Sequence, residues 1–309
     1  MNREKRANLA ASVRQRLLNI SRETGTDANF VWSRFVIERL LYRLASSDHG
    51  KKFVLKGALL FMVWTGQPYR PTYDLDLLGY GDSSSKRIAD IFKDICEMKV
   101  EQDGLIFDAK SVQVEPIREG QEYQGQRITL NAFLGKARVT IRVDIGFGDV
   151  VTPAAKMISY PILLDFPAPR IRAYTCESFV AEKLHALVVL GVTNSRMKDF
   201  YDLYVVGRDF SFQGNTLAEA IRATFERRKT SPPTSIPLSL TDEFAMDGVK
   251  QTQWNAFCRK GGLKETVPSL ADVIGHLRNF LLPPLSFLTS ASTKEAFGKI
   301  KWSAGGPWK

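Results

Sequence analysis

The spacing of hydrophobic residues changes along the chain, and the first stretch shows the spacing of helices. Apolar residues three and four positions apart predict a helix over residues 4–20. Asp27 has the character of a helix N-cap, and a second helix is expected from there to about Ser46. A short apolar strand over residues 53–55 follows, and a glycine turn leads from it into a helix over residues 59–64.

The middle of the chain alternates between apolar and polar residues with a period of two, which is typical of half-buried strands. The alternation is present in residues 111–114 and 127–130 and is strongest in residues 137–147. Residues 159–169 then contain three prolines and are expected to form a linker. The middle stretch therefore predicts a sheet that ends before the chain changes in character.

From Thr175 onward the spacing of apolar residues is again that of helices. Thr175 is the expected N-cap of a helix that ends at Gly191, and Gly207 is expected to end the next helix. A last helix is expected over residues 268–282, and the tail beyond Thr289 is expected to be partly loose. These patterns predict a mixed α+β chain whose C-terminal part is mainly helical.

Two aspartates occupy the start of a predicted strand that follows a loop. Because alternate side chains of a strand share a face, Asp74 and Asp76 are expected to lie side by side. Tyr73 and Leu75 are expected to point the other way, into the core. Two carboxylates about 6–7 Å apart on a strand suit a hard cation such as Mg²⁺. Asp144, on the third predicted strand, is a candidate third ligand, unless it is a solvent-facing strand residue.

The turn Lys56-Gly57-Ala58 joins a predicted strand to a predicted helix. Glycine lets the backbone approach a phosphate, and a helix N-terminus favours the negative charge of that phosphate. A glycine after a strand is more often an ordinary turn, so this motif carries little weight without the acids.

A further group of charged residues lies in the helical part. Asp199 and Asp202 are three positions apart and are expected to share a helix face. The alternative is an ordinary salt-bridged surface. His185 lies among apolar residues and is expected to be a core or edge histidine. The members of the charged group are Lys183, Arg196, Lys198, Asp199 and Asp202.

The charge balance favours an acidic partner. The 309 residues carry a formal net charge of +10, and the isoelectric point is about 9.5. The surplus is spread out, because residues 1–50 hold 9 basic and 5 acidic residues and residues 170–309 hold 19 and 13. No apolar run is long enough to predict a membrane span. The three scattered cysteines form no pair motif, so a reducing cytoplasm is the expected location.

The motifs taken together resemble a known family. Lys56-Gly57-Ala58 followed by the stretch RPTYDLD at residues 70–76 resembles the first motif of the polymerase-beta-like nucleotidyltransferase superfamily. The stretches AEKLHAL at 181–187 and RMKDFYDL at 196–203 are similar to later motifs of one branch, the AbiEii/AbiGii toxin family with its MenT-type mycobacterial toxins. The resemblance implies two lobes, here a nucleotidyltransferase domain over residues 1–170 and a helical domain over residues 171–309.

The resemblance also implies roles for the matching residues. Asp74 and Asp76 correspond to the metal-binding pair, and Lys183 corresponds to the lysine that contacts the triphosphate. Asp199 and Asp202 correspond to the acids of a lysine–aspartate motif and, with the first three, make up the expected catalytic set. Asp144 is expected to join the pair as a metal ligand. Nucleotide binding is expected from Lys56, Gly57, Ala58, Thr72, Lys183, Arg196 and Lys198. Ala58 stands where the family often has glycine or serine, so a hydroxyl donor is absent there.

The implied activity is Mg²⁺-dependent transfer of nucleotides from an NTP to an RNA acceptor, at the 3′ end of tRNA. The implied context is a two-gene toxin–antitoxin system in which an antitoxin is encoded nearby. Two alternatives remain: transfer to a protein hydroxyl or a small molecule, and non-catalytic binding of nucleotide or RNA. The presence together of Asp74, Asp76 and Lys183 argues against a mere binder.

Overall fold

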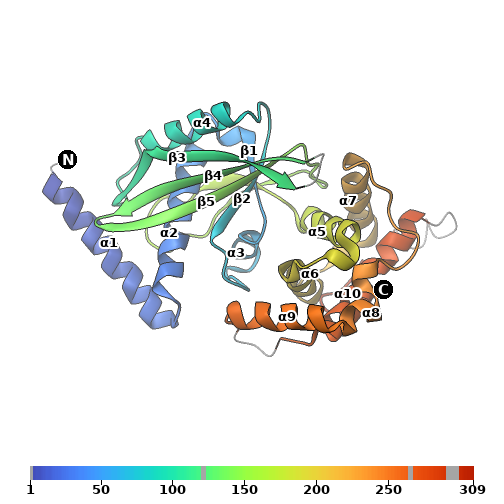
Figure 1. Ribbon diagram of the computed structural model, residues 1–309. Coiled ribbons are helices and arrows are strands. Elements are labelled where there is room, and N and C mark those ends of the chain that lie inside the picture. The colour runs from blue at the N-terminus through green and yellow to red at the C-terminus, as the bar shows by residue number, and fades with distance from the viewer. Residues whose placement is uncertain (1–2, 120–122, 264–266, 290–298) are drawn as a thin grey trace. The chain divides into compact units, whose positions relative to one another are not determined.

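The computed structural model describes residues 3–119, 123–263, 267–289 and 299–309 (Figure 1). The contacts within the chain divide it into two compact units. The first unit consists of Met1–Gly148 with Lys156–Ala173, and the second consists of Asp149–Ala155 with Tyr174–Lys309. The first unit combines a sheet with helices and the second is mainly helical, so the predicted mixed α+β class is confirmed.

A mixed sheet forms the centre of the first unit (Figure 1). In the described part of the chain it has seven strands in the order β3-β4-β5-β2-β1-β7-β6. The β2–β5 and β1–β7 pairs are parallel and the other pairs are antiparallel. The strands are β1 (Phe53–Lys56), β2 (Asp74–Gly79), β3 (Leu105–Glu119), β4 (Tyr123–Leu134), β5 (Ala137–Phe147), β6 (Lys156–Ser159) and β7 (Arg170–Ala173).

The strongest alternating stretch of the sequence is confirmed as a strand, because β5 spans the predicted residues 137–147. The two weaker stretches are short parts of β3 and β4, which pair along most of their length. The prediction of a linker over residues 159–169 is wrong. This segment joins β6 to β7, which pair with each other, and it therefore stays within the first unit.

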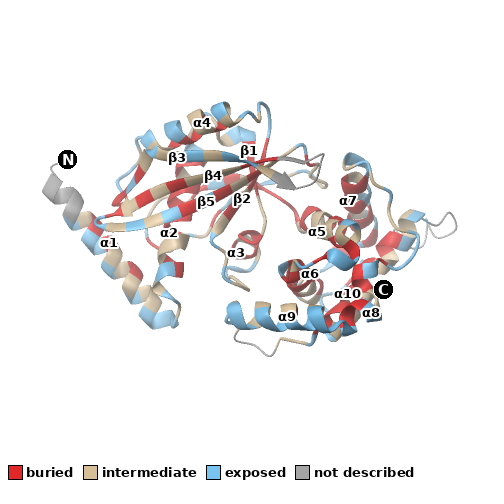
Figure 2. Cartoon of the chain, viewed as in Figure 1, coloured by how far each residue is buried: buried red, intermediate tan, exposed pale blue. Residues whose placement is uncertain are grey.

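The helices of the first unit are α1 (Arg3–Thr24), α2 (Ala28–Ser46), the short 3-10 helix η1 (Gly50–Lys52), α3 (Leu60–Thr65) and α4 (Ser85–Glu97). Asp27 caps α2 as predicted, since its carboxylate accepts a hydrogen bond from the Phe30 N–H at 2.9 Å. The helix α4 packs on β3, and α2 packs against β5 and β7. Buried residues occur on several sides of α2 (Figure 2). The charged residues of this helix must therefore find partners inside the protein.

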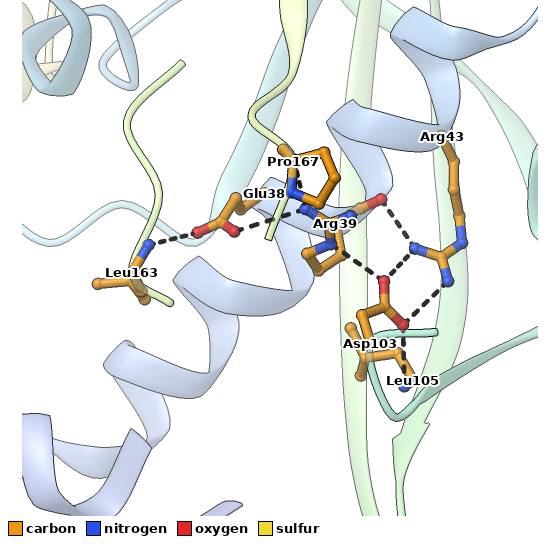
Figure 3. A network of polar contacts seen from close by, with 7 residues as sticks. All are labelled: Glu38, Arg39, Arg43, Asp103, Leu105, Leu163 and Pro167. Atoms are coloured by element: carbon orange, nitrogen blue, oxygen red, sulfur yellow. Dashed lines mark hydrogen bonds and ion pairs between the residues drawn. The ribbon is translucent and has the colours of Figure 1, made fainter. Parts of the chain in front are cut away.

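A buried polar network supplies these partners (Figure 3). Asp103, between α4 and β3, accepts hydrogen bonds from Arg43 at 2.6 and 3.1 Å and from Arg39 at 3.0 Å. Arg39 also donates to the Pro167 carbonyl at 2.7 Å. Burial would raise the pKa of Asp103, but the hydrogen bonds from the two arginines outweigh it and lower this pKa. The network therefore ties α2 to two loops that are distant from it in sequence.

Glu38 is the weakly paired member of the same network. One carboxylate oxygen accepts from the Leu163 N–H at 2.9 Å, and the other lies 3.9 Å from Arg39 and accepts no hydrogen bond. The residue is 1% exposed, and burial raises its pKa to about 7. Glu38 therefore exchanges a proton near neutral pH inside the fold.

The second unit consists mainly of helices that pack on one another. Thr175 caps α5 as predicted by accepting from the Ser178 N–H, and Gly191 ends that helix. The described elements are α5 (Cys176–Leu190), η2 (Gly191–Thr193), α6 (Met197–Asp209), β8 (Phe212–Gln213), α7 (Gly214–Arg227), η3 (Leu238–Leu240), α8 (Asp242–Met246), α9 (Gly248–Lys260), α10 (Leu270–Thr289) and β9 (Lys301–Trp302).

Two boundaries in this unit differ from the sequence prediction. The helix α6 does not end at Gly207 but continues to Asp209. A Cβ at Gly207 would lie 2.8 Å from His276 and 3.0 Å from Phe280, so this glycine serves close packing of α6 on α10 rather than termination. The helix α10 runs beyond residue 282 to Thr289 and contains two prolines.

The predicted loose tail falls partly outside the described residues, which resume at residue 299. The described end is not loose. Trp302 is 1% exposed, pairs with Phe212 between β9 and β8, and donates to the Gly207 carbonyl at 2.6 Å. In the part of the chain that the structure describes, no helix is both long and apolar enough to cross a membrane.

Candidate active site

The acids of β2 lie on one face of the sheet in the first unit. Asp74 and Asp76 are partly exposed and alternate with the fully buried Leu75 and Leu77, as the strand pattern predicts. The prediction for Tyr73 is wrong, because the residue is 49% exposed and its ring lies edge-on to Phe30. The reason is that β2 begins only at residue 74, so the alternation does not extend to the preceding residue.

The predicted turn brings its glycine directly against one of these acids. Gly57 has a φ of +75°, which side chains rarely adopt. A Cβ at this position would lie 2.0 Å from Oδ2 of Asp76, so only glycine fits beside the carboxylate as it is placed. Lys56 ends β1 opposite Asp76 in the sheet register, and Ala58 is buried. The turn and the acid pair therefore form one local site, as their sequence order suggests.

The helix after this turn contributes less than the sequence suggests. It is α3, which has six residues and begins three positions after Gly57. A helix of this length has few aligned peptide dipoles, so a phosphate would interact mainly with the turn itself. Thr72 is half-buried in the loop that precedes β2, two positions before the first acid.

The third candidate acid already has a close partner. Asp144 on β5 lies opposite Asp76 on the parallel strand β2. Its two oxygens accept from Arg127 on β4 at 2.8 and 2.6 Å, in a bidentate ion pair. Asp74 is held much less closely, since Arg142 is 3.7 Å away from its nearest oxygen. Asp144 and Asp74 thus share one face but differ in how closely a cationic side chain approaches them.

The donor set can be compared with the needs of a metal ion. Among the described residues, no group of three or more histidine, cysteine, aspartate or glutamate side chains is arranged to hold one. Mg²⁺ commonly takes one or two carboxylates and completes its six ligands with water and substrate phosphates. Asp74 and Asp76 fit that smaller set, beside a glycine turn whose missing side chain makes room for the Asp76 carboxylate.

The charged cluster predicted in the helical part forms a compact network within the second unit. Lys183 of α5 lies 2.5 Å from Asp199 and 2.9 Å from Asp202, which are both on α6 and fully buried. Arg196 forms a close ion pair with the other oxygen of Asp199 at 2.7 Å. Lys198 is exposed. Asp199 and Asp202 therefore share a helix face as predicted, and that face is buried rather than a salt-bridged surface.

Local structure explains how these side chains are positioned. The buried Asn194 accepts a hydrogen bond from the Arg196 N–H at 2.8 Å and so shapes the start of α6. The Lys183 ammonium also lies 4.9 Å from the ring centre of Phe179, one turn earlier on α5. The lysine is 13% exposed, so its charge is held at the edge of a buried region.

His185 is a core histidine, as its apolar neighbours predict. Burial, and then the charge of Arg228, lower its pKa to about 4. Arginine can only donate, so the 3.1 Å contact between Arg228 and Nδ1 places the ring proton on Nε2, 2.9 Å from the Thr230 hydroxyl. The imidazole is therefore neutral and supports the structure of the second unit.

Comparison with known families defines the class of the protein. Residues 39–275 match the model of the family described as nucleotidyl transferase AbiEii toxin, type IV TA system. The chain is thus a nucleotidyltransferase toxin of the type IV toxin–antitoxin class. It belongs to the AbiEii family. No curated protein shows a significant match to the chain.

Several solved structures resemble the chain at low sequence identity. MenT4, a nucleotidyltransferase toxin of Mycobacterium tuberculosis, is 14% identical with a TM-score of 0.49, and the match covers 91% of this chain and 99% of MenT4. JHP933 from Helicobacter pylori is 13% identical with a TM-score of 0.48, covering 85% and 90%. A putative nucleotidyltransferase of H. pylori is 13% identical with a TM-score of 0.46, covering 83% and 91%. The family assignment rests on the sequence match and not on these likenesses.

Sequence reasoning did not find two residues that shape the sites. Arg127 lies in an alternating strand, but nothing in the alternation shows which acid it faces, because that depends on the register of β4 and β5. Asn194 could have been found, since asparagine shortly before a helix is a known turn signal. Its burial and its hydrogen bond to Arg196, the N-cap residue of α6, give it a structural role.

Proposed function

We propose that this toxin transfers nucleotides from an NTP to the 3′ end of an RNA acceptor, tRNA, with a divalent cation at Asp74 and Asp76. The observation that carries the proposal is the contact between Gly57 and Asp76. It brings the glycine turn after β1 to the same point as a carboxylate pair. Nucleotidyl transfer needs these two elements together, because the triphosphate must be positioned and its charge neutralised.

The residues of the first unit have separate tasks in this proposal. Asp74 and Asp76 hold the cation, and the turn at Gly57, which lies against Asp76 and has no side chain of its own, is proposed to bind the phosphates. When bound, Mg²⁺ supplies charge neutralisation on the phosphates and acidifies a bound hydroxyl. Thr72, in the loop before β2, is proposed as a hydroxyl donor to phosphate.

Lys183 and Arg196 of the second unit are proposed to neutralise phosphate charge. Asp199 and Asp202 then act on the ammonium of Lys183 rather than on a metal, because both carboxylates are fully buried and lie against cations. Asp199 has one oxygen on each cation and is proposed to be the more important of the two acids. Lys198 is exposed and is proposed to make an outer phosphate contact.

The net positive charge of the protein supports RNA as the acceptor. A net charge of +10 that is spread over the chain suits an extended polyanion better than a small molecule. The family description supplies the toxin and nucleotidyltransferase activities and leaves the acceptor to experiment. A tRNA that is extended at its 3′ end could not be aminoacylated, which would account for toxicity.

The decisive experiment incubates the purified protein with Mg²⁺, each labelled NTP in turn, and total RNA or purified tRNA. We expect label in RNA of tRNA size, and none when the 3′ end has been oxidised with periodate. Asp76→Asn should abolish labelling without changing the thermal transition. Asp165→Asn, which removes a fully exposed carboxylate, is the matched control and should keep the activity.

Two outcomes would contradict the proposal. Equal labelling of oxidised RNA would exclude the 3′ hydroxyl as the acceptor. Label in protein rather than in RNA would favour transfer to a protein hydroxyl, and incubation with a cell extract followed by protease or RNase treatment separates the two cases.

A further inference from the structure

One face of the sheet in the first unit is open to solvent along β4 and β5. The helices α2 and α4 pack against these strands. The buried side chains form the other face and are those of Ile128, Leu130, Ala132, Leu134, Ile141, Val143 and Ile145. The residues that alternate with them are half-buried on β4 and mostly exposed on β5 (Figure 2). This open face also carries the acids of β2, because Arg142 and Asp144 of β5 pair with Asp74 and Asp76.

The open face of β4 and β5 carries an excess of positive charge. Within the paired residues of the two strands it holds three arginines and one aspartate. Arg127 forms the bidentate ion pair with Asp144. Arg142, whose side chain is 57% exposed, lies 3.7 Å from Asp74, which is longer than a hydrogen bond. Arg138 is exposed and forms no ion pair with a described residue. The guanidinium groups of Arg138 and Arg142 can therefore take a further anionic ligand.

The positions of these two arginines define a path across the sheet. Arg138 and Arg142 are four residues apart on β5, about 13 Å at the rise of an extended strand. Arg142 pairs with Asp74, so the path leads to the acid pair. On the far side of β4, the strand β3 presents Asp108 and Glu115 to the same face. A polyanion on this face is therefore repelled from β3 and is confined to β4 and β5.

We propose that the open face of β4 and β5 binds the acceptor RNA, with Arg138 and Arg142 on phosphates of the strand whose 3′ end lies at Asp74 and Asp76. This inference rests on the proposed function, because it names the surface that serves the same reaction. Single-stranded nucleic acid is commonly bound on the face of a sheet, where side chains that stand out from the strands reach its backbone and bases. The planar fork of a guanidinium suits the oxygens of a phosphate.

The test measures the affinity of the full-length protein for fluorescently labelled tRNA by anisotropy at several KCl concentrations. Arg138→Gln should weaken binding by roughly five- to tenfold, because it removes a charged hydrogen-bond donor to a phosphate. It should also reduce the steepness of the plot of log affinity against log salt by about 0.7. Arg138→Gln combined with Arg142→Gln should reduce this steepness by about 1.4.

The labelling reaction supplies a second readout that separates the two substrates. In Arg138→Gln the KM for tRNA should rise, while kcat and the KM for the NTP stay unchanged, since only binding of the acceptor is lost. Arg138→Lys keeps the charge and loses the fork, so its tRNA affinity should lie between those of the wild type and Arg138→Gln. A higher KM for the NTP without loss of tRNA affinity in the double variant would overturn the proposal, because the arginines would then serve the nucleotide.

Lys93→Gln is the matched control. It removes one positive charge from an exposed residue of α4, the helix that packs on β3 and β4. This variant should leave the tRNA affinity and its salt dependence unchanged. If Lys93→Gln weakened binding as much as Arg138→Gln, net charge rather than the open face would be responsible, and the proposal would be overturned.

Failure of this inference can be told apart from failure of the proposed function. If the wild type labels RNA, but Arg138→Gln and the double variant bind tRNA as tightly as the wild type, only the assignment of the surface is wrong. If the wild type does not label RNA, the proposed function fails and the surface loses its task with it.

Discussion

At the scale of single residues, the contact between Gly57 and Asp76 joins backbone conformation to chemistry. The carboxylate occupies the space where any other residue would place its Cβ, 2.0 Å from Oδ2. The positive φ of Gly57 adds a second reason for glycine. Gly66, which ends α3, has nearly the same φ of +73°, but a Cβ there would meet no atom within 4 Å. Comparing substitutions at the two glycines therefore separates the effect of backbone strain from the effect of displacing Asp76.

Gly57→Ala should lower the free energy of unfolding and also displace Asp76, so that Mn²⁺ binding and nucleotide transfer fall by at least about tenfold. Gly66→Ala should lower stability by a similar amount, about 1 kcal/mol from the left-handed backbone, and leave both activities intact. Urea unfolding and Mn²⁺ titration of the two variants check this. Equal loss of Mn²⁺ binding in both variants would show that strain, and not the contact with Asp76, is responsible.

At the scale of secondary-structure elements, α2 shows how a helix with buried charged residues remains stable. Asp103 accepts three hydrogen bonds from Arg39 and Arg43, and so links the helix to the loop before β3 (Figure 3). Glu38 has only a backbone N–H and a distant guanidinium to stabilise its charge. The network around this helix therefore contains one well-compensated acid, Asp103, and one that favours its protonated form, Glu38.

This difference predicts a pH dependence of stability. The folded-state pKa of Glu38 is about 7, above its ordinary value of 4.5, so the folded protein binds the proton more tightly than the unfolded chain. The stabilising effect of the protonated form is complete below pH 4.5 and is lost as the pH rises through 7. The difference in pKa corresponds to about 3 kcal/mol.

Glu38→Gln removes the titrating group and keeps its shape. Relative to the wild type, we expect the variant to gain free energy of unfolding by about 3 kcal/mol between pH 4.5 and pH 8. Urea unfolding of both proteins at several pH values gives this difference directly, and other titrating groups cancel in it. A difference that stays constant with pH would contradict the raised pKa.

At the scale of the whole molecule, charge is the property that bears on the acceptor. The surplus of ten positive charges is distributed over many parts of the chain rather than in one arm. Nucleic acid binds to such a surface largely by releasing counterions from its phosphates, whatever its sequence.

We therefore expect the affinity for tRNA to fall steeply with salt. The logarithm of the affinity should fall linearly with the logarithm of the KCl concentration, with a slope of about −0.7 to −0.9 for each phosphate contact. Fluorescence anisotropy of labelled tRNA between 50 and 300 mM KCl, roughly the range over which such effects are large, measures the slope. Sucrose at matched osmolality is the control and should leave binding unchanged. A slope near zero would exclude phosphate contacts as the main source of affinity.

Local patterns in the sequence determined the parts of this protein that depend on neighbouring residues. The caps Asp27 and Thr175, the strand β5 and the alternation around Asp74 and Asp76 all follow from residue types a few positions apart. The order of separated motifs also indicated the family, because motifs and their order can be recognised in a sequence without knowing which residues are in contact. These features are decided by backbone preferences and by which face of an element is apolar.

Tertiary structure alone decided the features that depend on distant partners. The register between β4 and β5 places Arg127 beside Asp144. The close packing of α10 on α6 requires glycine at position 207. The hydrogen bond from Arg39 of α2 to Pro167 holds the segment after β6 in the first unit. The membership of residues 149–155 in the second unit is likewise invisible in the sequence. Periodicity shows which side chains are buried, but shifting a strand by two residues leaves that pattern unchanged and exchanges every partner. Packing between distant segments therefore determines which charged side chains lie together at the proposed site.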